Sequence, residues 1–97
     1  MFNNISEVKQ ALDPVFDIYD ISYAILFGSY AKGTATPKSD LDIYVRSNLR
    51  GLKFVGFIED LRTAAGIPVD IFDESHIEAN SLIDNEIHDS GIIIYEK

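Results

Sequence analysis

The chain has 97 residues, of which 46% are hydrophobic and 25% charged, and its formal net charge is −8 at pH 7. This length supports one compact domain with a modest core, residues 1–97, and leaves no room for a second domain. The absence of cysteine excludes disulfides and thiolate metal sites. The acidic charge repels phosphate backbones, so it argues against an extended nucleic-acid surface.

Two further properties of the sequence concern its location. No basic segment followed by an apolar run opens the chain, as it would in a secretory signal peptide. The longest apolar runs, such as residues 92–95, are far too short to cross a bilayer. We therefore expect a soluble cytoplasmic protein that has no membrane partner.

The N-terminal segment predicts a helix. Apolar residues recur at helical spacing between residues 5 and 19, and Asn4 and Glu7 form a potential capping box at its start. Pro14 interrupts this pattern. It should either kink the helix or begin a second short helix that is capped by Asp13.

Strands and helices alternate along the rest of the chain. The expected segments are a strand at residues 22–27, a loop at 33–39, a strand at 40–46, a helix at 54–65, a strand at 69–72, one or two helices within 77–90, and a strand or extended tail at 92–95. In the last helical segment Ser81 is a plausible N-cap, and Leu82, Ile83 and Ile87 are expected to point inward. Strands separated by helices imply an α/β or α+β fold with a small mixed sheet flanked by helices.

A Gly-Ser pair follows the first predicted strand. Gly28 lets the backbone approach a ligand closely, and Ser29 adds a hydroxyl at the start of a short helix over residues 29–32. Such a turn can hold a triphosphate. By itself the pair is weak evidence, because a Gly-Ser pair after a strand is most often an ordinary turn.

Two aspartates lie one residue apart in the next predicted strand. Asp40 and Asp42 occupy positions i and i+2, so their side chains point to the same face, about 6.6 Å apart by strand rise. Two hard oxygen ligands with open positions suit Mg²⁺. An isolated pair of this kind is more often a solvated strand face, or a turn cap at Ser39-Asp40. The nearby Gly-Ser pair shifts the balance towards a metal site.

A third acid is expected in the strand at residues 69–72. Aspartate disfavours strand formation and is costly when buried without a partner, so we expect Asp70 to be compensated. If this strand lies beside residues 40–46, Asp70 completes a carboxylate cluster, either as a metal ligand or as the base for an attacking hydroxyl. Three close carboxylates without a cation raise one another's pKa values. Asp73 and Glu74 compete for the role, but their position at the strand end favours a solvated cap.

The run at residues 28–45, GSYAKGTATPKSDLDIYV, resembles the signature of the minimal nucleotidyltransferases in the polymerase-β-like superfamily. In that pattern Gly-Ser and Asp-x-Asp are followed by an aspartate on a later strand. The resemblance covers almost the whole chain, including VDIFDE at residues 69–74 and DSGIIIYEK at residues 89–97. It implies a nucleotidyltransferase fold and transfer of a nucleotide from a nucleoside triphosphate.

The resemblance also implies a role for each residue of the signature. Gly28 and Ser29 would hold the β- and γ-phosphates, Asp40 and Asp42 would bind two Mg²⁺ ions, and Asp70 would bind the catalytic ion or activate the acceptor hydroxyl. Ser39 would add a hydroxyl to the phosphates.

One position departs from the family pattern, which commonly has arginine where this chain has Lys32. Lysine keeps the charge but loses the bidentate fork. Lys32 either contacts phosphate or a partner, or is a solvated helix residue.

Minimal chains of this type are encoded beside HEPN-domain proteins. The resemblance therefore implies an antitoxin that transfers AMP from ATP to a tyrosine hydroxyl of a HEPN ribonuclease toxin. The acidic charge suits a protein acceptor better than tRNA.

Two alternatives remain open: a non-catalytic antitoxin that acts by occlusion, and an aminoglycoside-type nucleotidyltransferase, for which the chain lacks the usual acceptor-binding domain. A missing helical domain leaves apolar surface near the site, so homo- or hetero-oligomers are expected.

Overall fold

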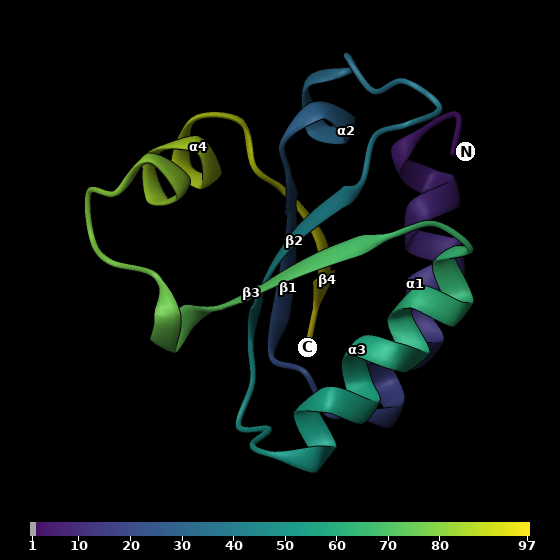
Figure 1. The fold of residues 1–97 in the computed structure, drawn as a ribbon, viewed down its shortest axis with the longest axis vertical. Helices are drawn as coiled ribbons and strands as arrows, with labels where there is room; N and C mark the ends of the chain where they lie inside the picture. Colours follow the sequence, from purple (N-terminus) through teal and green to yellow (C-terminus); the bar gives the residue numbers. More distant parts are fainter. Residues whose placement is uncertain (1) are drawn as a thin grey trace.

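The structure, a computed structural model, describes residues 2–97 and contains a four-stranded sheet with helices on both sides (Figure 1). In chain order the elements are α1 (Ile5–Ile18), β1 (Tyr23–Phe27), α2 (Ser29–Lys32), β2 (Leu41–Arg46), α3 (Leu52–Ala65), β3 (Val69–Asp73), the 3₁₀ turn η1 (Glu74–His76), α4 (Leu82–Ser90) and β4 (Ile92–Glu96). The predicted α+β class with a small mixed sheet is confirmed. None of the helices in residues 2–97 has both the length and the apolar character needed to span a bilayer.

The order of the strands puts β2 and β1 in the centre of the sheet and β3 and β4 at its edges. β1 runs antiparallel to β2 and β4, whereas β2 and β3 are parallel. Asp42 on β2 lies opposite Phe27 on β1 and opposite Asp70 on β3. Residues that face each other in register share a face of the sheet, so the two aspartates lie on the same side.

The main core lies between one face of the sheet and the pair of helices α1 and α3, which pack together in the lower right of Figure 1. Burial alternates along β2 as the sequence predicts, with Leu41, Ile43 and Val45 fully buried. Phe16 of α1 and Phe57 of α3 are also fully buried, and their ring centroids are 6.1 Å apart. The opposite face of β2 is therefore free to carry functional side chains.

The predicted cap of α1 is present. The side chain of Asn4 accepts a hydrogen bond from the Glu7 N–H at 3.0 Å, and the Glu7 carboxylate accepts one from the Asn3 N–H at 2.6 Å. The helix then continues through Pro14 as a single element, so no second helix begins at Asp13. Proline removes only one donor here, and the buried side chains before and after it, Val8, Leu12, Val15 and Phe16, hold both halves against the core.

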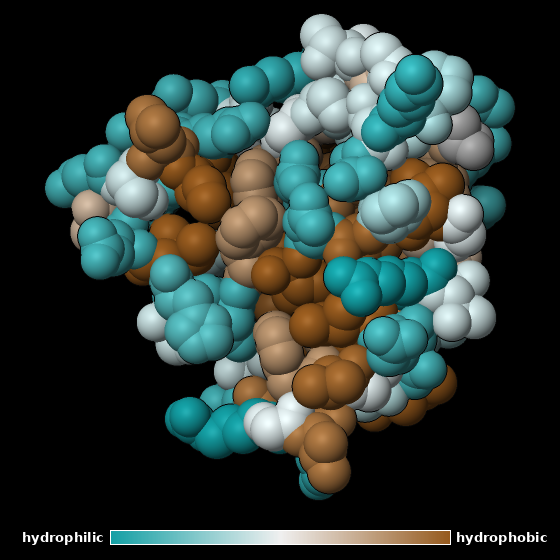
Figure 2. All heavy atoms as spheres, in the orientation of Figure 1, coloured by the Kyte–Doolittle hydropathy of each residue, from teal (hydrophilic) through white to brown (hydrophobic). Residues whose placement is uncertain are grey.

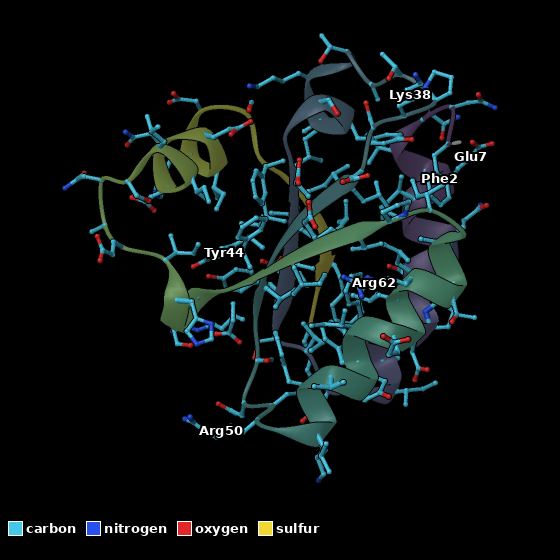
Figure 3. The ribbon with its side chains drawn as sticks, in the orientation of Figure 1. Phe2, Glu7, Lys38, Tyr44, Arg50 and Arg62 are labelled. Atoms are coloured by element: carbon cyan, nitrogen blue, oxygen red, sulfur yellow. The ribbon has the colours of Figure 1, made fainter. Side chains whose placement is uncertain are left out.

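The N-terminal residues also support α2, the short helix that follows Gly28. The ring of Phe2 packs edge-to-face on Tyr30, with centroids 6.5 Å apart. Figure 3 shows Phe2 and Lys38 at the same end of the molecule, so the loop between α2 and β2 lies near the start of the chain. This contact joins the residues before α1 to α2.

The helix α4 lies on the opposite side of the sheet from α1 and α3 (Figure 1). Ser81 is its N-cap, as predicted, and accepts a hydrogen bond from the Asp84 N–H at 3.1 Å. Ile87 is buried and Ile83 is half-buried, but the prediction that Leu82 points inward is wrong, because its side chain is 89% exposed. Ile83 and Ile87 are four residues apart and form the inward stripe, and Leu82 lies outside that stripe.

Candidate functional site

Gly28 brings the two halves of the sequence signature into contact. Its backbone has φ 74° and ψ −154°, a conformation that essentially only glycine adopts. A Cβ at this position would overlap Oδ2 of Asp42 and lie 3.2 Å from its Cγ. The missing side chain thus leaves room for the Asp42 carboxylate directly beside the turn into α2.

Asp42 and Asp70 lie side by side on neighbouring parallel strands, on the face that α1 and α3 leave open. The predicted adjacency of these two strands is confirmed. Asp42 is half-buried, whereas Asp70 and Asp40 are exposed. Asp40 comes just before β2, which begins at Leu41. Because Asp70 is exposed, water solvates its charge, and the partner group expected for a buried aspartate is not needed.

The environment of Asp42 disfavours its charged form. Burial, followed by the neighbouring carboxylates of Asp70, Glu86 and Asp40, raises the pKa of Asp42 from 3.8 to about 6. Mutual repulsion was expected from the sequence, but burial is the larger cause. The result is a centre of negative potential at which a bound cation would be strongly favoured.

Glu86, on α4, is a further carboxylate near Asp42 that the sequence did not reveal. Its Oε1 lies 3.1 Å from Nζ of Lys32, the last residue of α2. Lys32 is exposed, and its ion-pair partner in this structure is Glu86. The position of Glu86 depends on where α4 packs, and the only local signal was its place beside the inward residues Ile83 and Ile87.

The other two residues of the predicted phosphate site, Ser29 and Ser39, lie at the start of α2 and at the end of the loop that follows it. Ser29 begins α2 directly after Gly28, whose carbonyl accepts a hydrogen bond from the Lys32 N–H at 3.1 Å. The Ser39 hydroxyl accepts a hydrogen bond from the Thr36 N–H at 2.8 Å. In this structure Ser39 therefore stabilises the turn just before Asp40.

Asp73 and Glu74 do not take the place of Asp70 beside Asp42, because both carboxylates have partners elsewhere. Asp73 is an N-cap, as predicted, but it is buried rather than solvated: its side chain is 8% exposed, and its Oδ1 accepts hydrogen bonds from the N–H and hydroxyl of Ser75, both at 2.9 Å. It lies three residues after Asp70, on the opposite face of β3. Glu74 pairs with Nε of Arg46 at 2.8 Å.

Aromatic rings continue the same face of the sheet beyond Asp42. The centroids of Phe27 and Phe72 are 5.4 Å apart, and those of Tyr23 and Tyr44 are 6.1 Å apart. Burial, followed by the neighbouring Tyr23, raises the pKa of the Tyr44 hydroxyl above 10.0. Figure 3 shows Tyr44 on the α4 side of the sheet. Phe27 and Ile87 are buried outside the main core, and α4 contacts β1, so a second, smaller apolar layer lies between α4 and the sheet.

The donor set fits a Mg²⁺ ion that is completed by substrate. Within residues 2–97 no three acidic or histidine side chains converge closely enough to surround one ion, so the predicted cluster of Asp40, Asp42 and Asp70 is not closed around a single position. Mg²⁺ does not need such a cage, because it typically takes one or two carboxylates and fills its shell with water and substrate phosphates. The adjacent Asp42 and Asp70, open to solvent on one side, meet this requirement.

Comparison with known proteins identifies the family. Residues 10–97 match the family described as polymerase beta, nucleotidyltransferase. The chain belongs to this family. The membership predicted from the signature is confirmed, and the chain is a nucleotidyltransferase by family.

Its relatives include a candidate protein adenylyltransferase of Methanocaldococcus jannaschii, MJ1379, which is 30% identical over 98 residues and is matched over 93% of this chain and 97% of its own length. A chain from a toxin–antitoxin crystal structure with AMP-PNP has a TM-score of 0.76 at 20% identity, with coverage of 92% of this chain and 73% of that one. A chain from the complex of tri-AMPylated HEPN toxin with MNT antitoxin of Shewanella oneidensis has a TM-score of 0.71 at 16% identity, with coverage of 96% and 73%. These two structures share the fold of this nucleotidyltransferase.

Proposed function

We propose that residues 1–97 act as one minimal nucleotidyltransferase domain that transfers AMP from ATP to a tyrosine hydroxyl of a HEPN ribonuclease toxin, and so serves as a cytoplasmic antitoxin. The observation that carries the proposal is the contact of the Gly28 turn with Asp42, which lies in register with Asp70. This puts a backbone turn suited to phosphates directly beside two carboxylates suited to Mg²⁺. The relatives described as a protein adenylyltransferase and as antitoxins of HEPN toxins support the choice of acceptor.

Each residue of the site has a role in this proposal. Gly28 and Ser29 hold the β- and γ-phosphates, and Asp40, Asp42 and Asp70 hold one or two Mg²⁺ ions. When bound, Mg²⁺ neutralises charge on the phosphoryl oxygens. Position and electrostatics are then the main contributions of the protein.

Asp70 is suited to a second role because it is exposed. Its carboxylate can accept the proton of the tyrosine hydroxyl and release it to solvent. The tyrosine oxygen forms a bond to the α-phosphorus, the bond from that phosphorus to the β-phosphate bridging oxygen breaks, and pyrophosphate leaves. Proton acceptance by a positioned carboxylate typically contributes about 10²–10⁴-fold to the rate.

The proposed function is tested with ATP labelled either at the α- or at the γ-phosphate, Mg²⁺, and the protein encoded by the neighbouring gene, which the proposal requires to contain a HEPN domain. We expect α-label, and no γ-label, on a tyrosine of the HEPN protein, because only AMP is transferred. A Tyr→Phe variant of the labelled position and a reaction with EDTA serve as controls. Neutralisation without any label would instead support occlusion, and label on an aminoglycoside would support the small-molecule alternative.

The raised pKa of Asp42 predicts how Mg²⁺ binding depends on pH. The folded chain binds a proton at Asp42 more readily than the unfolded chain, so without Mg²⁺ this group favours folding increasingly as pH falls from above 6 towards 3.8. Mg²⁺ needs the carboxylate. We therefore expect the rise in melting temperature caused by Mg²⁺ to be largest above pH 6 and to shrink below it, as measured by thermal unfolding with and without MgCl₂. An equal rise at every pH, or an unchanged profile in Asp42→Asn, would contradict this assignment.

A further inference from the structure

An apolar groove opens at the N-terminal end of α4. Leu82 is 89% exposed, and it lines a shallow groove of about 470 Å³ together with Ile77 and Ile83. We refer to Ile77, Leu82 and Ile83 as the Leu82 surface. Figure 2 shows apolar atoms in the region of α4 surrounded by hydrophilic side chains. An apolar centre with a polar rim is typical of protein-binding surfaces.

The Leu82 surface lies next to Glu86, the carboxylate of α4 that is near Asp42. Leu82 and Glu86 are four residues apart, so they are neighbours on the same side of α4, separated by about 6 Å along the helix axis. Leu82 also lines the hollow between α2 and α4 together with Lys32 and Glu86. Glu86 is close enough to Asp42 to raise its pKa. A macromolecule seated on Leu82 therefore has parts of its own surface close to Asp42.

The charge around the Leu82 surface decides which kind of macromolecule fits. The sequence has no lysine or arginine between Arg62 and Lys97, whereas Glu78, Asp84, Glu86 and Asp89 lie on or just before α4. The groove is lined by one acidic residue and one histidine, Glu78 and His76, and the nearby Lys32 is paired with Glu86. Acidic side chains therefore outnumber basic ones around the Leu82 surface. This acidic rim repels nucleic acid, anionic lipid and a second copy of the same chain. A protein with a basic surface is the complementary partner.

We propose that the Leu82 surface is the docking site for the acceptor protein, which meets it with an apolar patch surrounded by lysine or arginine side chains. This proposal rests on the proposed function, since the docked protein is the one that offers the tyrosine. Docking at α4 brings the acceptor to the open face of the sheet, on which Asp42 and Asp70 lie. In this proposal α4 selects the acceptor protein, whereas the signature at residues 28–45 binds the nucleotide.

The chain offers a matched control for the test. Leu52, at the start of α3, is also 89% exposed, but it belongs to the helix layer on the other face of the sheet. Its neighbours in sequence include Arg50 and Lys53, so its surroundings are basic rather than acidic. Neither leucine contributes much buried area to the fold, so we expect both Leu82→Ser and Leu52→Ser to remain folded with an unchanged melting temperature.

The experiment measures three quantities for the wild type and both variants. The probe is the protein encoded by the neighbouring gene, which the proposed function requires to contain a HEPN domain. The quantities are the dissociation constant of the complex, by titration calorimetry, the KM and kcat of labelling, and the affinity for Mg²⁺–AMP-PNP. We expect Leu82→Ser to weaken the complex and raise the KM for the HEPN protein by about tenfold or more, since an exposed leucine at the centre of an interface loses its burial. Its kcat and its affinity for Mg²⁺–AMP-PNP should not change. Leu52→Ser should match the wild type in every respect.

The outcomes separate this proposal from the proposed function. Equal effects of Leu82→Ser and Leu52→Ser, or no effect of either, overturn docking at α4 and leave adenylyl transfer standing if label is still found. If the wild-type chain binds the HEPN protein without labelling it, and Leu82→Ser loses this binding, the docking surface is supported and adenylyl transfer is overturned. A wild-type chain that neither binds nor labels the HEPN protein overturns both.

Discussion

Replacing Asp42 by asparagine is expected to reduce AMP transfer by about a hundredfold or more and, without Mg²⁺, to make the chain more stable. The lost carboxylate is a predicted metal ligand, and metal stabilisation of phosphoryl charge is worth several kcal/mol. The gain in stability follows from the pKa of about 6, because the folded environment opposes the charge of Asp42 at neutral pH. Transfer is measured with α-labelled ATP, and stability by thermal unfolding in EDTA.

Asp60→Asn is the matched control for Asp42→Asn. The Asp60 carboxylate accepts a hydrogen bond from the Tyr19 hydroxyl at 2.6 Å, between α3 and the end of α1. Its replacement weakens a structural contact far from the site, so melting temperature should fall slightly while transfer is retained. If Asp42→Asn instead destabilised the EDTA-treated chain as Asp60→Asn does, Asp42 would be a structural residue.

Gly28→Ala is expected to abolish Mg²⁺–ATP binding as well as to destabilise the fold. The positive φ at Gly28 costs an alanine about 1–3 kcal/mol. In addition, the new Cβ would overlap Oδ2 of Asp42, so the carboxylate must move away from its place opposite Asp70. Thermal unfolding reports the first effect, and titration of Mg²⁺ with AMP-PNP reports the second.

Gly51→Ala separates backbone strain from the clash. Gly51 precedes α3 as Gly28 precedes α2, and its φ of 59° and ψ of −131° are close to those of Gly28, but a Cβ there would meet nothing within 4 Å. We expect a similar loss of melting temperature in both variants and loss of nucleotide binding in Gly28→Ala alone. If the two variants bind nucleotide equally well, the position of Asp42 does not depend on Gly28.

The local patterns of the sequence predicted most of the elements because each pattern depends on near neighbours in the chain. Burial alternates along Leu41–Arg46 as the period of a strand requires, and Asn4 and Ser81 are N-caps as their side chains allow. Even Asp70 was found, because an aspartate inside an apolar strand is locally anomalous.

The arrangement of α4 could not be predicted in the same way, because it depends on contacts between distant segments. Glu86 joins the site only because Ile83 and Ile87 place α4 over the aromatic face of the sheet. The sequence predicts that Leu82, Ile83 and Ile87 all point inward, because the apolar character of three residues in one short helix does not show which of them form the buried stripe. The burial of Asp73 also involves a distant segment, because its Oδ2 accepts a hydrogen bond at 3.4 Å from the hydroxyl of Ser47, which follows β2.

The position of β3 at the edge of the sheet gives Asp70 a second consequence. An outer strand exposes unpaired N–H and C=O groups, and a strand of another molecule can add to it and start aggregation. Asp70 is exposed in this strand, and its charge opposes such pairing. The aspartate that disfavours strand formation thus also protects the edge, which makes the colloidal stability of the chain depend on a residue of the candidate site.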